Sequence, residues 1–326
     1  MTDFVEFLNT TRVGDFLKSK DMIIVESSST LDQLLNTFYQ FSIFSAPVVD
    51  QQKVVGVVDM LDVVNFIIEF SGLKIQSNLS LLETNPQKFT SILGTGGNLF
   101  SESTVSTILN NRQNKLFVVR NVDPCMKLIS IYNDIITKVF ILDELNEIIN
   151  LASQTDVLAI VAQNIHLLGD RKKFTVEQSG ICTTFKKSFT SETRVINILK
   201  EFLDNNMIAA PIIDPKTSKL VANFSITNIK SLKKDNFDEL MLPVLDYLRF
   251  QSIKEKKRNL SCLKENSFYP LTCYATDTLE YAIFKLVATK VHRLWLIDQD
   301  GKPSHMIGID AILKNIALPS MDVEKN

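Results

Sequence analysis

The chain has 326 residues, of which 45% are hydrophobic and 22% charged, and its formal net charge at pH 7 is −2. This is the composition of an ordinary globular protein, and it excludes a broad positive field for nucleic acid or anionic lipid. The four cysteines, Cys125, Cys182, Cys262 and Cys273, lack the paired spacing of zinc or redox motifs. Residues 1–10 lack the basic start and apolar core of a signal peptide, which predicts a cytoplasmic or nuclear protein.

One pattern recurs along the chain: a short helix, a strand that ends in an acidic turn, a second strand and a second helix. In the first copy, Ser29 or Thr30 can cap a helix whose apolar residues have helical spacing. Residues 46–50 and 54–58 are then predicted as two strands. Asp59 begins the second helix. The apolar face of that helix comprises Val63, Val64, Phe66, Ile67 and Ile68.

The second copy is the least regular. Its first helix is predicted around residues 105–109, and its strands at residues 116–119 and 128–131. A further helix is expected near Asp134. Between the first two copies, residues 94–97 are rich in glycine but lack the Lys-Ser/Thr of a phosphate-binding loop, so they are predicted as a flexible loop.

The third and fourth copies are clearer. Residues 209–214 read Ala-Ala-Pro-Ile-Ile-Asp and repeat the Ala-Pro-Val-Val-Asp of residues 46–50 almost directly. A second strand at residues 220–225 leads into a helix that contains Ile226 and Ile229. The fourth copy has a helix through Leu279, Ile283, Leu286 and Val287, a strand over 291–298, a second strand at 306–308 and a closing helix.

Each copy is too small to bury its own apolar face, so the copies are expected to stack in pairs that form two lobes. Residues 141–149 and 157–168 are predicted as amphipathic helices that connect the lobes. The predicted boundaries are 11–140 for the first pair (repeats 11–70 and 85–140), 141–176 for the helical connection, and 177–318 for the second pair (repeats 177–234 and 262–318).

The junction of the second strand and the second helix is the candidate ligand site. Helix starts present free backbone N–H groups and a partial positive charge to phosphate. Asp62, one turn into the helix of the first copy, could accept hydrogen bonds from both ribose hydroxyls of a nucleotide. Alternatively, Asp59 is an ordinary N-cap and Asp62 a first-turn acid that the helix dipole favours. The residues alone leave both interpretations open.

These repeats resemble CBS modules, and four in one chain resemble the gamma subunit of the AMP-activated (SNF1-type) protein kinase. The resemblance covers nearly the whole chain and is strongest over residues 271–273, 277–280 and 291–294 with Asp298. Residues 243–248 are similar to the segment that precedes the family's last repeat. The resemblance implies an α/β fold in which two pairs of repeats form a flat pseudo-symmetric disk.

It also implies a non-catalytic regulatory subunit that binds AMP, ADP or ATP without a metal and associates with alpha-type kinase and beta-type scaffold subunits. The family's ribose-binding aspartate corresponds to Asp62 in the first repeat, lies near Asp134 in the second, and is replaced by Asn228 in the third. In the fourth repeat it falls on Ala311, with Asp310 adjacent.

The phosphate-binding positions are only partly retained. A hydroxyl remains at Ser225 in the third repeat, whereas Asp59 and Gly308 stand at this position in the first and fourth. The family's central basic residues correspond to His292 and Arg293 in the fourth repeat. His292 could also be a packed edge residue, since one histidine is weak support for a ligand site.

In the second repeat, the basic position corresponds to Asn114 and Lys115, which keep one positive charge without the two-point grip of arginine. Phe44 replaces the basic residue in the first repeat. The resemblance therefore implies one nucleotide site or none.

Three functions remain open: a nucleotide-sensing kinase subunit, which we favour, a ligand-free interaction scaffold on the same fold, and an enzyme. Sensing is favoured by Asp62, Lys115, Ser225, His292 and Arg293, and the scaffold by Phe44, Asn228 and Ala311. An enzyme would need converging acid, base or metal-binding groups, and the three histidines show no such spacing. The basic run at residues 254–258 is predicted as a solvated helix face or a linker and not as a binding patch.

Overall fold

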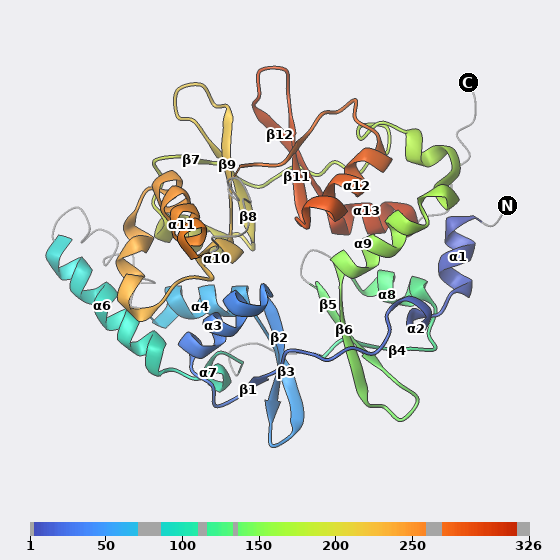
Figure 1. Cartoon of the computed structure of the whole chain (residues 1–326). Helices are drawn as coiled ribbons and strands as arrows, with labels where there is room; N and C mark the ends of the chain where they lie inside the picture. Colours follow the sequence, from blue (N-terminus) through green and yellow to red (C-terminus); the bar gives the residue numbers. More distant parts are fainter. Residues whose placement is uncertain (1–2, 71–85, 110–115, 133–135, 259–268, 318–326) are drawn as a thin grey trace. The chain divides into compact units, whose positions relative to one another are not determined.

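The computed structural model describes residues 3–70, 86–109, 116–132, 136–258 and 269–317. The chain forms two compact units (Figure 1). Unit 1 comprises Met1–Met22, Leu116–Phe185 and Leu271–Asn326, and unit 2 comprises Ile23–Lys115 and Lys186–Pro270. Each unit thus combines alternate repeats: the second and fourth in unit 1, and the first and third in unit 2.

The strands of the described residues form four three-stranded sheets, one for each repeat. In every sheet a short first strand pairs parallel to the second, which pairs antiparallel to the third. The predicted α/β class with four tandem repeats is therefore confirmed. The strands are β1 (Val25–Glu26), β2 (Ser45–Asp50), β3 (Lys53–Asp59), β4 (Val118–Arg120), β5 (Lys138–Leu142), β6 (Ile148–Ser153), β7 (Phe189–Thr190), β8 (Ala209–Ile213), β9 (Leu220–Ser225), β10 (Thr272–Cys273), β11 (Arg293–Ile297) and β12 (Pro303–Gly308).

Unit 2 has one core built from the apolar faces of its helices and sheets. Thr30 begins α3 as predicted: its side chain accepts a hydrogen bond from the backbone N–H of Gln33, whose own side chain accepts from the Thr30 N–H. Helix α4 contacts both α10 and η2, which joins the first repeat to the third. The helices are α3 (Leu31–Phe41), α4 (Met60–Phe70), α6 (Pro86–Glu102), α7 (Val105–Leu109), α10 (Val195–Asp204), η2 (Ile226–Ile229), η3 (Lys234–Met241) and α11 (Val244–Arg258).

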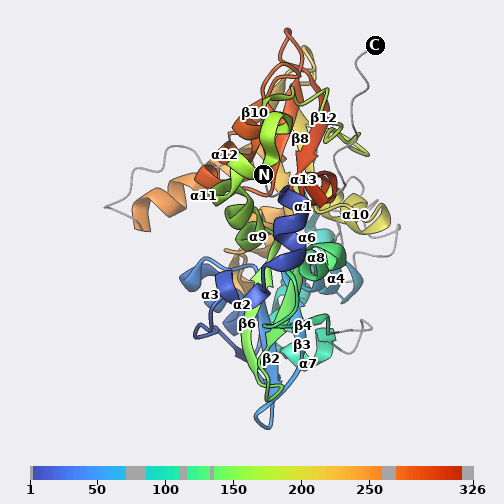
Figure 2. The same ribbon diagram turned by 90° about the vertical axis from the view of Figure 1, so that its right-hand side faces the viewer.

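Unit 1 has its own core, in which helices of the second and fourth repeats pack together. Helix α9 contacts α12 and α13, and α13 also contacts α8. The N-terminal helix α1 lies beside α8 (Figure 2). The helices are α1 (Phe4–Thr10), α2 (Val13–Phe16), α8 (Cys125–Ile131), α9 (Gln154–Gln163), η1 (Ile165–Lys173), α12 (Leu279–Thr289) and α13 (Ile309–Ala317).

The second repeat differs from its predicted structure. The predicted strand at residues 128–131 is wrong, because these residues belong to α8, whose buried Cys125, Leu128 and Ile129 have helical spacing. The predicted helix at residues 141–149 is also wrong, because this segment closes the β5–β6 hairpin. Asp143 begins the turn, and its Oδ1 accepts from the backbone N–H of Leu145 at 2.9 Å. Short apolar runs have no period long enough to distinguish helix from strand.

The predicted helical connection at residues 141–176 consequently contains β6 and α9 of the second repeat. Each predicted pair of consecutive repeats, at 11–140 and 177–318, contains one repeat from each unit. This pairing stays a prediction.

The glycine-rich residues 94–97 lie inside α6, so the predicted loop is wrong. Figure 1 shows α6 running beside η3. A Cβ atom at Gly97 would lie 2.8 Å from the carbonyl oxygen of Lys234, which is closer than carbon and oxygen can approach. Glycine is present here because the backbones of α6 and η3 meet at this point.

Candidate functional site

Strand register identifies corresponding positions in the four repeats. The second strand of each sheet forms a hairpin with the third. In each hairpin, the first residue of the second strand pairs with the residue directly before the following helix. These pairs are Ser45 with Asp59, Lys138 with Ser153, Ala209 with Ser225, and Arg293 with Gly308. Lys138 is therefore the counterpart of Arg293 in the second repeat.

A backbone hydrogen bond supports this correspondence. The N–H of the first helical residue donates to the carbonyl of the residue before the strand: Met60 to Phe44 at 3.1 Å, Ile226 to Ile208 at 3.0 Å, and Ile309 to His292 at 3.3 Å. Phe44, Ile208 and His292 thus occupy one position of the repeat. The register gives Thr137 as its counterpart in the second repeat.

The helix that follows each hairpin begins with a capping arrangement in three repeats. In α4, Asp62 Oδ2 accepts from the backbone N–H of Asp59 at 2.8 Å, and Asp59 Oδ1 accepts from the N–H of Leu61 at 2.8 Å. In η2, Asn228 Oδ1 accepts from the N–H of Ser225 at 2.7 Å. The cap interpretation of Asp62 therefore rests on an observed hydrogen bond. Asp62 is also buried.

The second repeat has a reciprocal cap between Ser153 and Asp156. Ser153 Oγ accepts from the N–H of Asp156 at 3.2 Å, and Asp156 Oδ2 accepts from the Ser153 N–H at 2.8 Å and from its hydroxyl at 2.6 Å. Asp156 is half-buried. This pair has the spacing of serine and aspartate that the family resemblance requires at the ribose position.

Sequence reasoning missed Ser153 and Asp156 because the strands of the second repeat were placed about twenty residues too early. A usable signal was present: Ser-x-x-Asp stands before the apolar run of α9. Lys115 and Asp134, the residues predicted instead, lie outside the described residues, so their roles remain untested.

Unit 1 brings His292 together with two cations. Surrounding protein lowers the pKa of His292 to about 4, first by burial and then through the charges of Arg293 and Lys138. The side chain nevertheless keeps an exposed surface. At neutral pH it is therefore an uncharged imidazole that can still be reached by a ligand.

Arg293 is half-buried and remains charged at neutral pH. Burial lowers its pKa to about 10, and the carboxylate of Asp310 opposes that change. Asp310 also lies 3.5 Å from the ammonium of Lys314. Asp310, which was predicted to bind nucleotide, thus lies near the cations Arg293 and Lys314. Ala311 corresponds to Asp156 of the second repeat and has no polar side chain.

Unit 2 presents a different surface at the same positions. Phe44, Ile208 and Ala209 replace the basic side chains. The ammonium of Lys230 lies 5.8 Å from the ring centroids of both Tyr39 and Phe44. The predicted Ser225, Asn228 and Asp62 are all in this unit, but the predicted His292 and Arg293 are not.

No group of three His, Cys, Asp or Glu side chains within the described ranges is arranged to hold a metal ion. The described cysteines are free. Burial raises the pKa of the thiol to about 11 for Cys125 and to about 12 for Cys273. Among the described residues, no helix combines the length and the apolar character needed to cross a membrane.

Comparisons with known proteins assign two of the repeats to a family. The CBS domain family matches residues 13–69 and 267–318. Protein SDS23 of Kluyveromyces lactis is 30% identical over 131 residues, which cover 37% of this chain and 24% of that protein. The 5'-AMP-activated protein kinase subunit gamma of Dictyostelium discoideum is 25% identical over 175 residues, or 52% of this chain and 28% of that protein. The chain thus spans about a quarter of the length of these relatives.

Among solved structures, a Methanocaldococcus jannaschii protein that has been proposed as an archaeal homolog of g-AMPK matches with a TM-score of 0.64 and 17% identity. The match covers 93% of this chain and 99% of that chain. At this identity the likeness shows a shared fold and nothing more.

Proposed function

Because the chain is a protein of tandem CBS repeats related to gamma subunits and to SDS23, we propose that it is a regulatory subunit that binds an adenine nucleotide in unit 1. The observation that carries the proposal is that unit 1 places Lys138, Ser153, Asp156 and His292 near one another. Lys138 pairs with Ser153, Ser153 bonds to Asp156, and the charge of Lys138 acts on His292.

The cations of unit 1 suit a phosphate group. Lys138 and Arg293 supply two positive charges, and the guanidinium can hold two phosphate oxygens at once. Each charge-assisted hydrogen bond of this kind contributes about 1.5–3 kcal/mol. Two of them account for roughly a hundredfold in affinity or more.

Neutral His292 adds a donor that responds to the ligand. A phosphate beside the imidazole would oppose the positive charges that now lower its pKa, so binding would raise that pKa from about 4. Nucleotide binding is therefore coupled to proton uptake in mildly acidic solution.

Asp156 suits the ribose. Its Oδ2 holds the start of α9, and its other oxygen is directed to neither the Ser153 N–H nor the Ser153 hydroxyl. A carboxylate accepts hydrogen bonds from two neighbouring hydroxyls readily, and an amide such as Asn228 does so less well because one of its polar atoms is a donor.

The residues of unit 2 favour the alternative function for that unit, namely a scaffold that has lost nucleotide binding. The corresponding positions there are Phe44, Ile208 and Ala209, which cannot attract phosphate. Asp62 and Ser225 remain, but the nearby cation, Lys230, lies against the rings of Tyr39 and Phe44. We therefore assign one nucleotide to the chain, in unit 1.

A regulatory subunit must transmit binding to partners. We propose that these are an alpha-type kinase subunit and a beta-type scaffold subunit of the SNF1 type, in the cytoplasm or nucleus. The Dictyostelium relative is a subunit of that kind of complex by name. The nucleotide must favour one state of the assembly over another by about 1–3 kcal/mol to act as a regulator.

Calorimetric titration of the purified chain with AMP, ADP and ATP tests the proposal. Saturable binding of one nucleotide, weakened about a hundredfold by Arg293→Ala, is expected from the loss of a two-point phosphate contact. An absence of heat with all three nucleotides would assign the whole chain to the scaffold function.

A further inference from the structure

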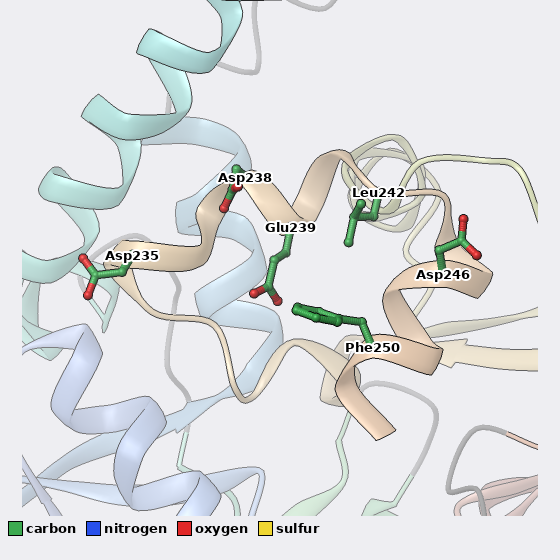
Figure 3. A pocket seen from close by; sticks show the side chains of 6 residues that line it. All are labelled: Asp235, Asp238, Glu239, Leu242, Asp246 and Phe250. Atoms are coloured by element: carbon green, nitrogen blue, oxygen red, sulfur yellow. The ribbon is translucent and has the colours of Figure 1, made fainter. Parts of the chain in front are cut away.

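A second candidate site lies in unit 2. A surface hollow of about 510 Å³ opens between η3 and α11. Its lining consists of Asp235, Asp238, Glu239, Leu242, Asp246 and Phe250. Figure 3 shows Glu239 and Phe250 pointing toward one another at its centre, with Asp235 and Asp246 at opposite ends.

The centre of the hollow is apolar and accessible. Phe250 is 43% exposed although it carries a large aromatic ring, and Leu242 beside it is half-buried. Ile253, one turn further along α11, is also exposed. An exposed aromatic ring in a hollow is the usual anchor point of a protein interface.

The chain's own Lys254 indicates what this hollow recognises. Its ammonium forms an ion pair with Glu239 and lies 4.3 Å from the centroid of the Phe250 ring. Two of the residues that line the hollow therefore already bind one lysine, by charge and by cation–π attraction. The contact of Lys254 with the Phe250 ring does not depend on the acidic side chains of the hollow.

The acids of the hollow differ in whether they are paired within the chain. Glu239 is paired: besides the contact with Lys254, its second oxygen accepts a hydrogen bond from Gln251 Nε2 at 2.7 Å. Asp235 and Asp238 are exposed on η3. Asp246 is exposed too, and its ion pair with Arg249, at 3.6 Å, lies at the surface, where such a pair contributes little.

We propose that this hollow docks a basic segment of a partner protein, which places an apolar side chain on Phe250 and Leu242 and lysine or arginine side chains against Asp235, Asp238 and Asp246. Charge complementarity selects this occupant: the three exposed carboxylates of Asp235, Asp238 and Asp246 lie beside the apolar centre, and an acidic segment would be repelled there.

The test uses a fluorescein-labelled synthetic 12-residue peptide of alternating lysine and leucine, with fluorescence anisotropy as the readout. Saturable binding is expected, and Phe250→Ala or the double change Asp235→Asn with Asp238→Asn should weaken it about tenfold. Lys254→Met should tighten it, because it removes the internal competitor. Circular dichroism, measured at the temperature of the binding experiment, shows whether each variant is folded.

Matched controls make the result specific. Phe41→Ala removes another exposed ring of unit 2, and Asp300→Asn removes an exposed carboxylate of unit 1; both should leave the affinity within about twofold of the wild type. The same peptide with glutamate in place of lysine should not bind. The proposal is overturned if the control variants weaken binding equally, or if Phe250→Ala binds the peptide fully. Either result would mean that the peptide binds by nonspecific charge attraction.

Sedimentation analysis checks the other occupant. Self-association of the chain that disappears in Phe250→Ala would show that a second copy fills the hollow, and the proposal of a basic partner segment would then be wrong. A monomer that binds the peptide supports it.

Discussion

Asn228 and Asp156 occupy the same place in two helices and differ by a single polar atom. Asn228 Oδ1 accepts from the backbone N–H of Ser225 at 2.7 Å, and Asp156 Oδ2 accepts from the N–H of Ser153 at 2.8 Å. The chain therefore shows that an amide can cap this helix as a carboxylate does. Capping and ligand binding can be separated experimentally at this position.

Asp156→Asn should weaken nucleotide binding about tenfold or more while the stability of unit 1 changes little. The amide can keep the bond to Ser153, as Asn228 does for Ser225, but it presents a donor where the ribose needs an acceptor. Calorimetric titration measures the affinity, and urea unfolding measures the stability.

Asp62→Asn is the matched control, because Asp62 caps α4 in unit 2 through the same bond, to the N–H of Asp59. It should leave nucleotide affinity unchanged. Asp62→Ala is a poorer choice, since loss of this cap costs about 1 kcal/mol of stability. Loss of binding in Asp62→Asn but not in Asp156→Asn would move the site to unit 2.

Arg293→Lys should lower the affinity for nucleotide about tenfold, although the positive charge is kept. A lysine ammonium cannot hold two phosphate oxygens in the planar geometry of a guanidinium. Lys138→Arg is the reciprocal change and should preserve or improve binding. Titrations at two salt concentrations provide the check: equal affinities of Arg293→Lys and the wild type would mean that only the charge matters.

His292 makes the stability of unit 1 depend on pH. The pKa of its imidazole is about 6.5 in the unfolded chain and about 4 in the folded one, because burial, Arg293 and Lys138 disfavour the proton. Between these values only the unfolded chain binds the proton. Stability is therefore unaffected above pH 6.5 and falls as the pH decreases toward 4.

His292→Gln should remove this dependence. The check is the urea concentration at the unfolding midpoint, measured for the wild type and the variant at pH 7, 6 and 5. As the pH decreases, the midpoint of the wild type should fall relative to that of the variant. Parallel pH profiles of the two proteins would show that His292 titrates normally.

The repeat pattern was predictable wherever a strand ended in an unmistakable signal. Residues 46–50 and 209–214 share Ala-Pro followed by two β-branched residues and an aspartate, and both form the predicted strand. The hairpin of the fourth repeat was found from the same ending at Asp298. These features specified the α/β class and the number of repeats.

The second repeat was not predictable by the same means. Its hairpin lacks proline, and Leu128 and Ile129 suit a strand as well as a helix, so the choice was decided by packing that local sequence does not contain. That error displaced the predicted basic residue to Lys115 and hid Lys138. Which repeats share a unit was also not predictable, because helix contacts between distant segments decide it.

Two glycines of α6 offer a paired test of its packing against η3. A methyl group at Gly97 would meet the carbonyl oxygen of Lys234, whereas a Cβ at Gly94 would have no neighbour within 4 Å. Gly97→Ala should therefore destabilise unit 2 by about 1–3 kcal/mol. Gly94→Ala should stabilise it by up to about 1 kcal/mol, because alanine favours the helix more than glycine does. Urea unfolding of the two variants measures the difference, and equal stabilisation by both changes would show that α6 and η3 do not meet at Gly97.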